Sequence, residues 1–180
     1  MFRKLLVISL LTIFSLTNCG GGGGGDDPLD FVGAATVDLR NQPHRIDPGN
    51  HTRVQVKVSD VHKNGIALKV RFPVGLLYVP DSAELTVDSV NKDMNPDVNA
   101  SDNNYVYLVW YMDQSLFGPN GEKSGSLVFE LRGVSEVDDG NIEAMVSVLD
   151  PHLPDGTGFD INNPNFSAQT DDYITVNSPS

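Results

Sequence analysis

Apolar and polar residues alternate along much of this chain, and this alternation constrains the fold more than any other feature. In residues 52–58 (TRVQVKV) the valines fall on one face of an extended chain and the polar residues on the other. The same two-residue period places four apolar side chains on one face within residues 65–74 (GIALKVRFPV). Successive strand side chains point to opposite faces, so this pattern is typical of half-buried strands. Helical periodicity is nearly absent, and the chain is predicted to be all-β.

Further segments with strand character are separated by turn residues, which predicts an antiparallel β-sandwich of about eight or nine short strands. These segments are residues 35–40, 75–79, 83–90, 105–112, 124–131, 141–149 and 172–177. Asn64-Gly65 favours a tight hairpin turn between the strands 52–58 and 65–74. Two stretches rich in Asn, Asp, Pro and Gly, residues 91–104 and 151–171, are predicted to be loops.

Two long segments carry a family resemblance. VHKNGIALKVRFPVGLLYVPDSAEL (residues 61–85) resembles the turn and strand run of Ig-like conserved-repeat domains in bacterial surface proteins. VWYMDQSLFGPNGEKSGSLVFEL (residues 109–131) is similar to the second half of those domains and to cohesin-like sandwiches. The resemblance covers about residues 52–150 and implies an Ig-like or cohesin-like sandwich at a cell surface. The chain departs from the family in having one copy instead of a tandem array, and in the long insertion at residues 91–104.

The first residues predict export and lipid attachment. A short positive start precedes an apolar run over residues 5–16, which is shorter than the roughly 20 residues of a membrane-spanning helix and fits a cleaved signal peptide. Cys19 follows LTN, which resembles the lipobox of bacterial lipoproteins, although Asn18 stands where Gly, Ala or Ser is usual. An ordinary signal peptide with an unrelated cysteine is the alternative.

A lipidated Cys19 is expected to hold the protein on a membrane without a spanning helix. Cys19 is also the only cysteine, so it cannot form a disulfide within the chain. The six glycines that follow it predict a flexible tether. The expected organisation is a signal peptide over residues 1–18, a lipidated cysteine and tether over 19–30, and one sandwich domain over 31–180. In many enteric lipoproteins, an aspartate directly after the lipidated cysteine signals retention in the inner membrane. Gly20 occupies that position here, which favours a location at the outer membrane or cell surface.

The charge of the chain excludes some partners. Removal of residues 1–18, which include Arg3 and Lys4 but no acidic residue, leaves 10 basic against 24 acidic residues, a net charge of −14. No basic stripe is available to neutralise phosphates, so nucleic acid is not an expected partner. Anionic lipid is not expected to bind this surface electrostatically either.

An aromatic strand over residues 105–112 (YVYLVWYM) provides the first candidate site. Tyr105, Tyr107 and Tyr111 share one face, while Trp110 lies on the other. An open row of tyrosines could stack against sugar rings or a protein partner. The favoured interpretation is that Trp110 fills the core and the tyrosines pack beneath a loop, for which the insertion at residues 91–104 is the candidate. A strand that is apolar on both sides is expected to be covered on both faces.

An acidic loop provides a second candidate site, for calcium. Oxygen ligands of the kind that Ca²⁺ prefers occur at Asp150, Asp155, Asp160 and Asn162. The same residue types dominate ordinary turns, so no cofactor is required and calcium is the less favoured interpretation. The four histidines have no zinc-site spacing, and no nucleophile motif of hydrolases occurs.

The sequence thus predicts a lipid-anchored bacterial envelope protein with a non-catalytic role in binding, adhesion or assembly. Its expected partners are the membrane, through Cys19, and an envelope protein or polysaccharide. A carbohydrate-binding module that uses the tyrosine face is the alternative, and a hydrolase with an unrecognised carboxylate pair is less favoured.

Overall fold

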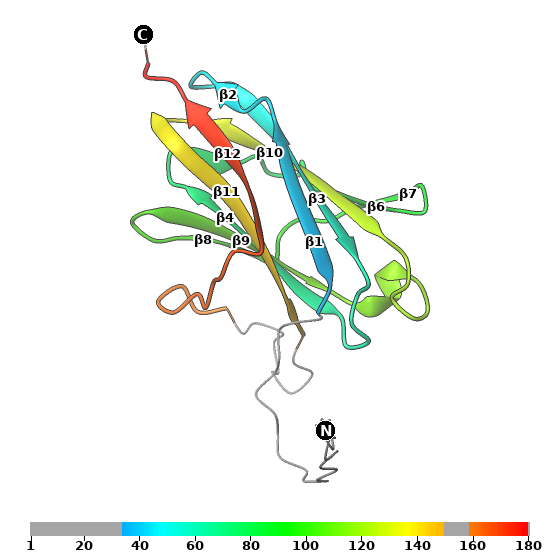
Figure 1. Ribbon diagram of the computed structural model, residues 1–180. Coiled ribbons are helices and arrows are strands. Elements are labelled where there is room, and N and C mark those ends of the chain that lie inside the picture. Colours follow the sequence, from blue (N-terminus) through cyan, green and yellow to red (C-terminus); the bar gives the residue numbers. More distant parts are fainter. Residues whose placement is uncertain (1–33, 150–158, 180) are drawn as a thin grey trace, which may run out of the picture.

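The computed structural model describes residues 34–149 and 159–179, which form two packed β-sheets (Figure 1). Sheet A runs in the order β1 (Thr36–Gln42), β3 (His51–Ser59), β10 (Gly125–Gly133), β6 (Glu84–Val87) and β7 (Val90–Asp93), with β5 (Leu76–Tyr78) also paired to β10. Sheet B runs in the order β2 (Arg45–Ile46), β12 (Thr170–Val176), β11 (Val137–Val148), β4 (Ile66–Pro73), β9 (Tyr105–Met112) and β8 (Val98–Ser101). One 3-10 helix, η1 (Gln114–Phe117), completes the described elements. The predicted all-β sandwich is confirmed.

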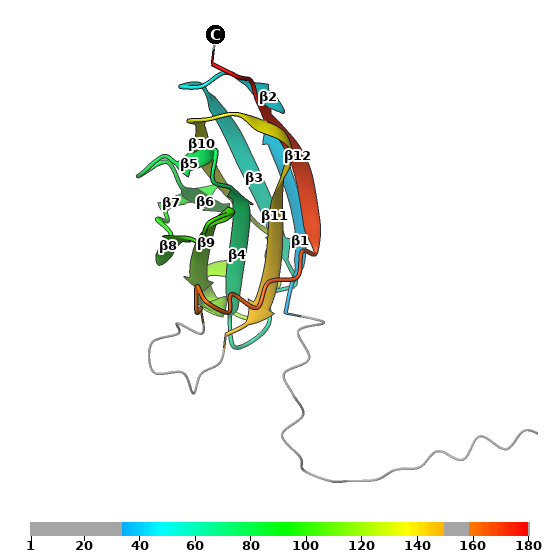
Figure 2. The same ribbon diagram turned by 90° about the vertical axis from the view of Figure 1, so that its left-hand side faces the viewer.

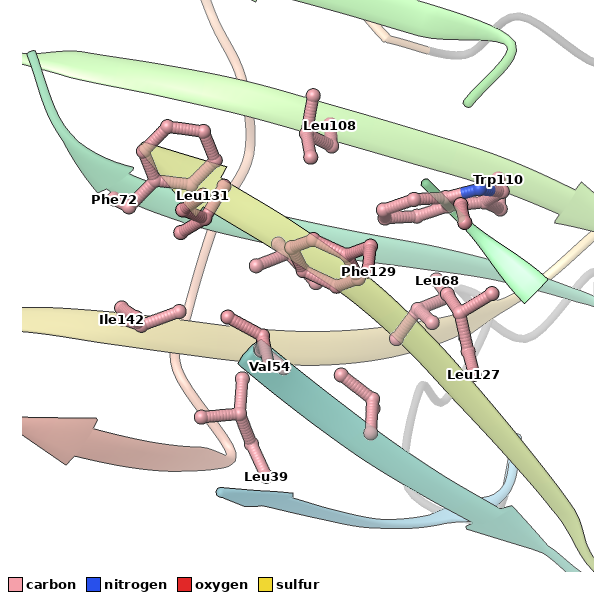
Figure 3. Packing of buried hydrophobic residues seen from close by; sticks show 14 of the residues in the cluster. Leu39, Val54, Leu68, Phe72, Leu108, Trp110, Leu127, Phe129, Leu131 and Ile142 are labelled. Carbon is pink, nitrogen blue, oxygen red and sulfur yellow. The ribbon is translucent and has the colours of Figure 1, made fainter. Parts of the chain in front are cut away.

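The core lies between the sheets and is built from the alternating residues (Figure 3). Trp110 of sheet B and Phe129 of sheet A are both fully buried, with ring centroids 5.3 Å apart. The Trp110 indole Nε1 donates a hydrogen bond to the Met94 carbonyl at 2.6 Å, which satisfies its one polar atom. Removal of this apolar surface from water is the main stabilising term of such a sandwich, at about 25 cal/mol per Å².

The structure has more strands than the sequence predicted, because the expected loop at residues 91–104 is largely extended. It holds most of β7 and all of β8, each paired with its sequence neighbour. The predicted strand over residues 83–90 is instead folded back on itself. Asp88 and Ser89 both have positive φ values, 48° and 65°, and form the two-residue tip of the β6–β7 hairpin. Asp-Ser lacks the glycine that usually marks such a turn, so the sequence signal was weak.

The turn at Asn64-Gly65 does reverse the chain, but the predicted hairpin is wrong. β3 belongs to sheet A and β4 to sheet B, so this connection crosses from one sheet to the other. Gly65 adopts a positive φ of 81°, and a Cβ there would collide with the Met112 carbonyl of β9. The glycine is needed for close packing of the turn against sheet B as well as for its backbone conformation.

One open side of the sandwich is closed by bonds between the two sheets. The free backbone edge of β1 faces β12, and the Asn41 N–H donates to the Asp172 carboxylate at 2.9 Å. The Leu39 N–H donates to the Thr170 hydroxyl at 3.4 Å. Side chains of β12 therefore occupy backbone donors that an exposed edge strand would leave free.

Residues 159–169 precede β12, and we call this segment the strap. It opens with a turn closed by the Asp160–Asn163 bridge and continues without regular secondary structure. Figure 2 shows it in orange, crossing the lower ends of β9, β4 and β11. The strap falls within the predicted loop at residues 151–171, and the earlier part of that loop lies outside the described residues. Within the described parts of the chain, no helix is long and apolar enough to span a membrane.

Candidate functional site

The tyrosine row lies on the outer face of sheet B, and the strap covers it. The Phe159 ring centroid lies 5.5 Å from that of Tyr107, and the Phe166 centroid lies 6.2 Å from it. Tyr107 is only 2% exposed as a result, and burial raises the pKa of its phenol. Tyr105 and Tyr111 are half-buried. Tyr107 therefore lacks the open ring face that stacking on a sugar requires. The covering loop is the strap and not the insertion at residues 91–104.

Arg71 links the strap to the sheet through two aromatic rings. Its guanidinium carbon lies 4.6 Å from the Tyr105 ring centroid and 4.4 Å from the Phe166 centroid. The guanidinium also donates two hydrogen bonds to the Glu143 carboxylate of β11, and this bonding raises the Arg71 pKa. A delocalised cation held between two rings and a carboxylate is a stable arrangement for a partly buried arginine.

Lys69 is the most enclosed cation on this face. Its side chain is directed away from the core, as the alternation predicted, but the strap leaves the residue only 6% exposed. Its Nζ donates to the carbonyl oxygens of Pro164, at 3.3 Å, and Asn165, at 3.5 Å. Burial lowers the Lys69 pKa because it disfavours the charged form. Lys69 thus secures the backbone of the strap, and Arg71 secures its aromatic side chain.

The C-terminal end of the strap forms hydrogen bonds with the backbone of β11, much as a neighbouring strand would. The Gln169 side-chain amide accepts from the Val146 N–H at 2.9 Å and donates to the Val146 carbonyl at 3.3 Å. Its backbone N–H donates to the Ala144 carbonyl at 2.9 Å. Sequence reasoning missed the strap and its two cationic partners, because alternation alone marks outward residues of β4 as solvent-facing.

Only part of the predicted calcium site lies among the described residues. Asp150 and Asp155 lie outside the described residues. Asp160 and Asn162 lie at the start of the strap, where the Asp160 carboxylate accepts hydrogen bonds from the backbone and side chain of Asn162. Among residues 34–149 and 159–179, no group of three or more His, Cys, Asp and Glu side chains is placed to hold a metal ion. The calcium site stays a prediction, and so does the lipidation site at Cys19, which also lies outside the described residues.

The outer face of sheet A is covered by none of the described residues and is mainly polar. Cross-strand neighbours pair polar side chains, as in His51 with Glu130, which are 2.8 Å apart, and Gln55 with Ser126, which are 2.7 Å apart. No Phe, Tyr or Trp lies on this face of the described strands. A shallow hollow of about 540 Å³ opens beside β1 and β3, lined mainly by arginine and amide side chains such as Arg40 and Arg53. These features suit a hydrated protein surface more than a catalytic centre.

Comparison with known proteins shows similarity in fold. No family model matches the sequence, and no curated protein matches it. The structure of the Corynebacterium diphtheriae major pilin SpaA superposes with a TM-score of 0.52 at 10% sequence identity, over 78% of this chain and 36% of that chain. The N-terminal domain of the Streptococcus gordonii adhesin Sgo0707 superposes with a TM-score of 0.50 at 11% identity, over 79% of this chain and 32% of that chain.

This chain spans about a third of the length of those pilin and adhesin chains. At such low identity, the likeness shows the β-sandwich fold alone. AvmM, which catalyses macrocyclization in alchivemycin A biosynthesis, also superposes, with a TM-score of 0.43 at 14% identity, over 82% of this chain and 92% of that chain. A superposition of that quality carries no argument about activity.

Proposed function

We propose that this protein is a non-catalytic binding and assembly module of the bacterial envelope, attached to the outer membrane through a lipidated Cys19. The observation that carries the proposal is the combination of a self-contained sandwich with a lipobox-like cysteine. Ala34, a short way beyond the glycine tether in the sequence, is already fully buried in the core of the sandwich. The fold is one that adhesin and pilin domains also use.

The surfaces of the domain support a binding role over a catalytic one. The outer face of sheet A presents paired polar side chains, and the strap occupies the outer face of sheet B. Carbohydrate stacking on the tyrosine row receives no support from this arrangement, because the rings of Tyr105 and Tyr107 face Arg71 and the strap. An envelope protein is therefore the favoured partner.

Lipid attachment is tested by substitution of the cysteine. The full chain and its Cys19→Ala variant would be expressed in a two-membrane bacterium and labelled with an alkyne-bearing palmitate analogue. The full chain is expected to take up the label and to fractionate with the outer membrane, and Cys19→Ala is expected to lose both properties. Asn18→Ala is the matched control, because it retains the thiol and restores a usual residue before it. Label that persists in Cys19→Ala would overturn the proposal.

The class of partner is tested by cross-linking on intact cells. A protein-binding role would be supported by recovery of one specific envelope protein. The yield of that protein should fall when residues of the sheet A face, such as Arg53, are changed to Glu. Recovery of polysaccharide in place of protein would favour carbohydrate binding over protein binding. It would direct attention back to Tyr105 and Tyr111, the two less buried members of the row.

A further inference from the structure

The borders of the two sheets differ in how well they are protected against pairing with another chain. The β1 border is occupied by Thr170 and Asp172 of β12. The β7 border carries the charged pair Lys92 and Asp93, and charge on an edge strand opposes association. The border strand β2 has only two residues, Arg45 and Ile46.

The remaining border of sheet B, β8, has no such protection from the described residues. Its four residues read VNAS, with no charge and no proline. Acidic residues flank the strand, but both carboxylates are turned into the hairpin. Asp97 accepts from the Tyr111 N–H at 2.7 Å. Asp102 accepts from the N–H groups of Asn104 and Tyr105, at 2.7 Å each. Both residues are solvent-exposed, but their carboxylates are bonded within the hairpin, and no charged side chain lies on β8 itself.

The register of the β8–β9 hairpin shows which backbone groups are free. The Asp102 N–H donates to the Tyr105 carbonyl at 3.0 Å, which closes the hairpin. Hydrogen-bonded positions alternate along an antiparallel strand, so Ala100, opposite Tyr107, also directs its N–H and carbonyl toward β9. The backbone groups of Asn99 and Ser101 therefore point away from the sheet. Figure 1 shows β8 at the outer border of its sheet.

We propose that β8 pairs antiparallel with β8 of a second copy of this chain, about a twofold axis at Ala100. In this register Asn99 of each copy lies opposite Ser101 of the other. All the outward backbone groups of these two residues then form hydrogen bonds across the axis. Ala100 faces its own counterpart at a non-hydrogen-bonded position, where side chains approach most closely and a small residue fits. The two B sheets become one continuous sheet, and the interface is isologous.

Shifted registers are less favourable. An axis at Asn99 pairs that residue with itself and places Ser101 opposite Asp97, whose N–H already donates to the Val109 carbonyl at 2.8 Å. An axis at Ser101 places Ala100 opposite Asp102. The Ala100 register alone uses every free group of β8 and brings no charged side chain onto the axis.

The size of this border determines where the pairing is expected. A strand of four residues buries less than the roughly 1,000 Å² that a stable dimer in solution needs. Confinement to a membrane raises the effective concentration and favours such weak contacts. The inference deepens the proposed assembly role by naming its partner, and it rests on the lipid anchor only for this concentration effect.

The pairing is tested by a single cysteine at the axis. Cα atoms at non-hydrogen-bonded pairs lie about 4.5 Å apart, within the range of a disulfide. The full lipidated chain carrying Ala100→Cys is expected to form disulfide dimers on intact cells under a mild oxidant such as diamide. Asn91→Cys, at an outward-pointing position of the β7 border, is the matched control. We expect the Ala100 variant to cross-link at least about tenfold faster. Equal rates would indicate random collision and would overturn the proposal.

Proline variants test the hydrogen bonds themselves. Asn99→Pro removes an N–H that points away from the hairpin, so the fold is expected to tolerate it, as edge strands do. In the Ala100→Cys background, Asn99→Pro is expected to abolish cross-linking, and Asn91→Pro is expected to leave it unchanged. Persistence of the cross-link in Asn99→Pro would overturn the proposed register.

A charge pair separates failure of this inference from failure of the lipid anchor. Neither Ala100→Lys nor Ala100→Glu is expected to dimerise alone, because each would place two like charges opposite each other across the axis. Co-expression of the two variants would place a lysine opposite a glutamate and is expected to restore co-purification. Failure of the mixture to associate on membranes would overturn the pairing. Loss of the anchor would appear separately, as release of the parent chain from the membrane fraction.

Discussion

The guanidinium carbon of Arg71 lies 4.4 Å from the centroid of the Phe166 ring, so a residue of β4 holds the strap against the outer face of sheet B. The contact joins two segments that are far apart in the sequence. It also explains why Tyr107, on the outer face of sheet B, is almost fully excluded from solvent: the strap, and not a second sheet, covers its ring.

Removal of this contact is expected to loosen the strap without unfolding the sandwich. Phe166→Ala should lower the free energy of unfolding by about 1–2 kcal/mol, from lost ring burial and the lost cation–π contact. Amide exchange should become faster in residues 159–169 but not in β3. Tyr173→Ala is the control, because that residue is 56% exposed and, among the described residues, its ring stacks on His44 at the surface. Equal protection of the strap in both variants would contradict the role of Phe166.

A buried amide beside the β1–β12 seam is expected to be unfavourable. Asn41 is 3% exposed, and neither Nδ2 nor Oδ1 of its side chain has a hydrogen-bond partner among the described residues. Asn41→Leu keeps a similar shape and removes this cost, so thermal unfolding should show stability equal to the parent or higher by about 1 kcal/mol.

The contrasting substitution is Thr52→Val. The Thr52 hydroxyl is buried and donates to the Pro43 carbonyl at 2.8 Å. Loss of that bond should lower stability by about 1 kcal/mol. A parallel loss in Asn41→Leu would show that the amide has a partner after all.

Two glycines with positive φ are expected to respond differently to alanine. A Cβ at Gly121, where φ is 71°, would collide with the Val61 carbonyl, whereas a Cβ at Gly49, where φ is 89°, meets no described atom within 4 Å. Gly49→Ala should therefore cost only the left-handed backbone energy, about 1 kcal/mol. Gly121→Ala should lower the free energy of unfolding, measured in urea, by more than this. The Val61 carbonyl belongs to the backbone and cannot move aside as a flexible side chain would. Equal costs would mean that the loop at Gly121 shifts freely.

The turn of the β8–β9 hairpin should contribute to acid sensitivity. Backbone N–H donors of Asn104 and Tyr105 hold the pKa of Asp102 below its ordinary value of 3.8. A carboxyl whose pKa is lower in the folded state stabilises the fold above its unfolded pKa, and loses that contribution as the pH falls through the folded value.

The urea midpoint of the parent chain should therefore fall more steeply below pH 3.8 than that of Asp102→Asn. The comparison requires a matched measurement near neutral pH, where neither chain changes its protonation at this position. Identical acid slopes would exclude a contribution from Asp102.

The inward faces of the long strands were predictable from alternation. The predicted core positions on β3, β4 and β10, among them Val56, Leu68 and Phe129, are all fully buried. A period of two requires only that one face of each strand be covered, and it does not depend on which strand lies beside it. The predicted hairpin between β3 and β4 was wrong for the same reason, because turn residues specify a reversal of the chain and not the sheet that the next strand joins.

Local pattern thus determined the fold class, the strand faces and the positions of most turns, since each of these depends on neighbouring residues along the chain. Tertiary structure alone decided which strands pair, that the strap covers Tyr107, and that no described strand pairs with the outer edge of β8. These features depend on contacts between distant segments, such as Lys69 with Pro164. Such contacts leave no periodic signal in either segment, because each side chain satisfies its local pattern equally well with or without its partner.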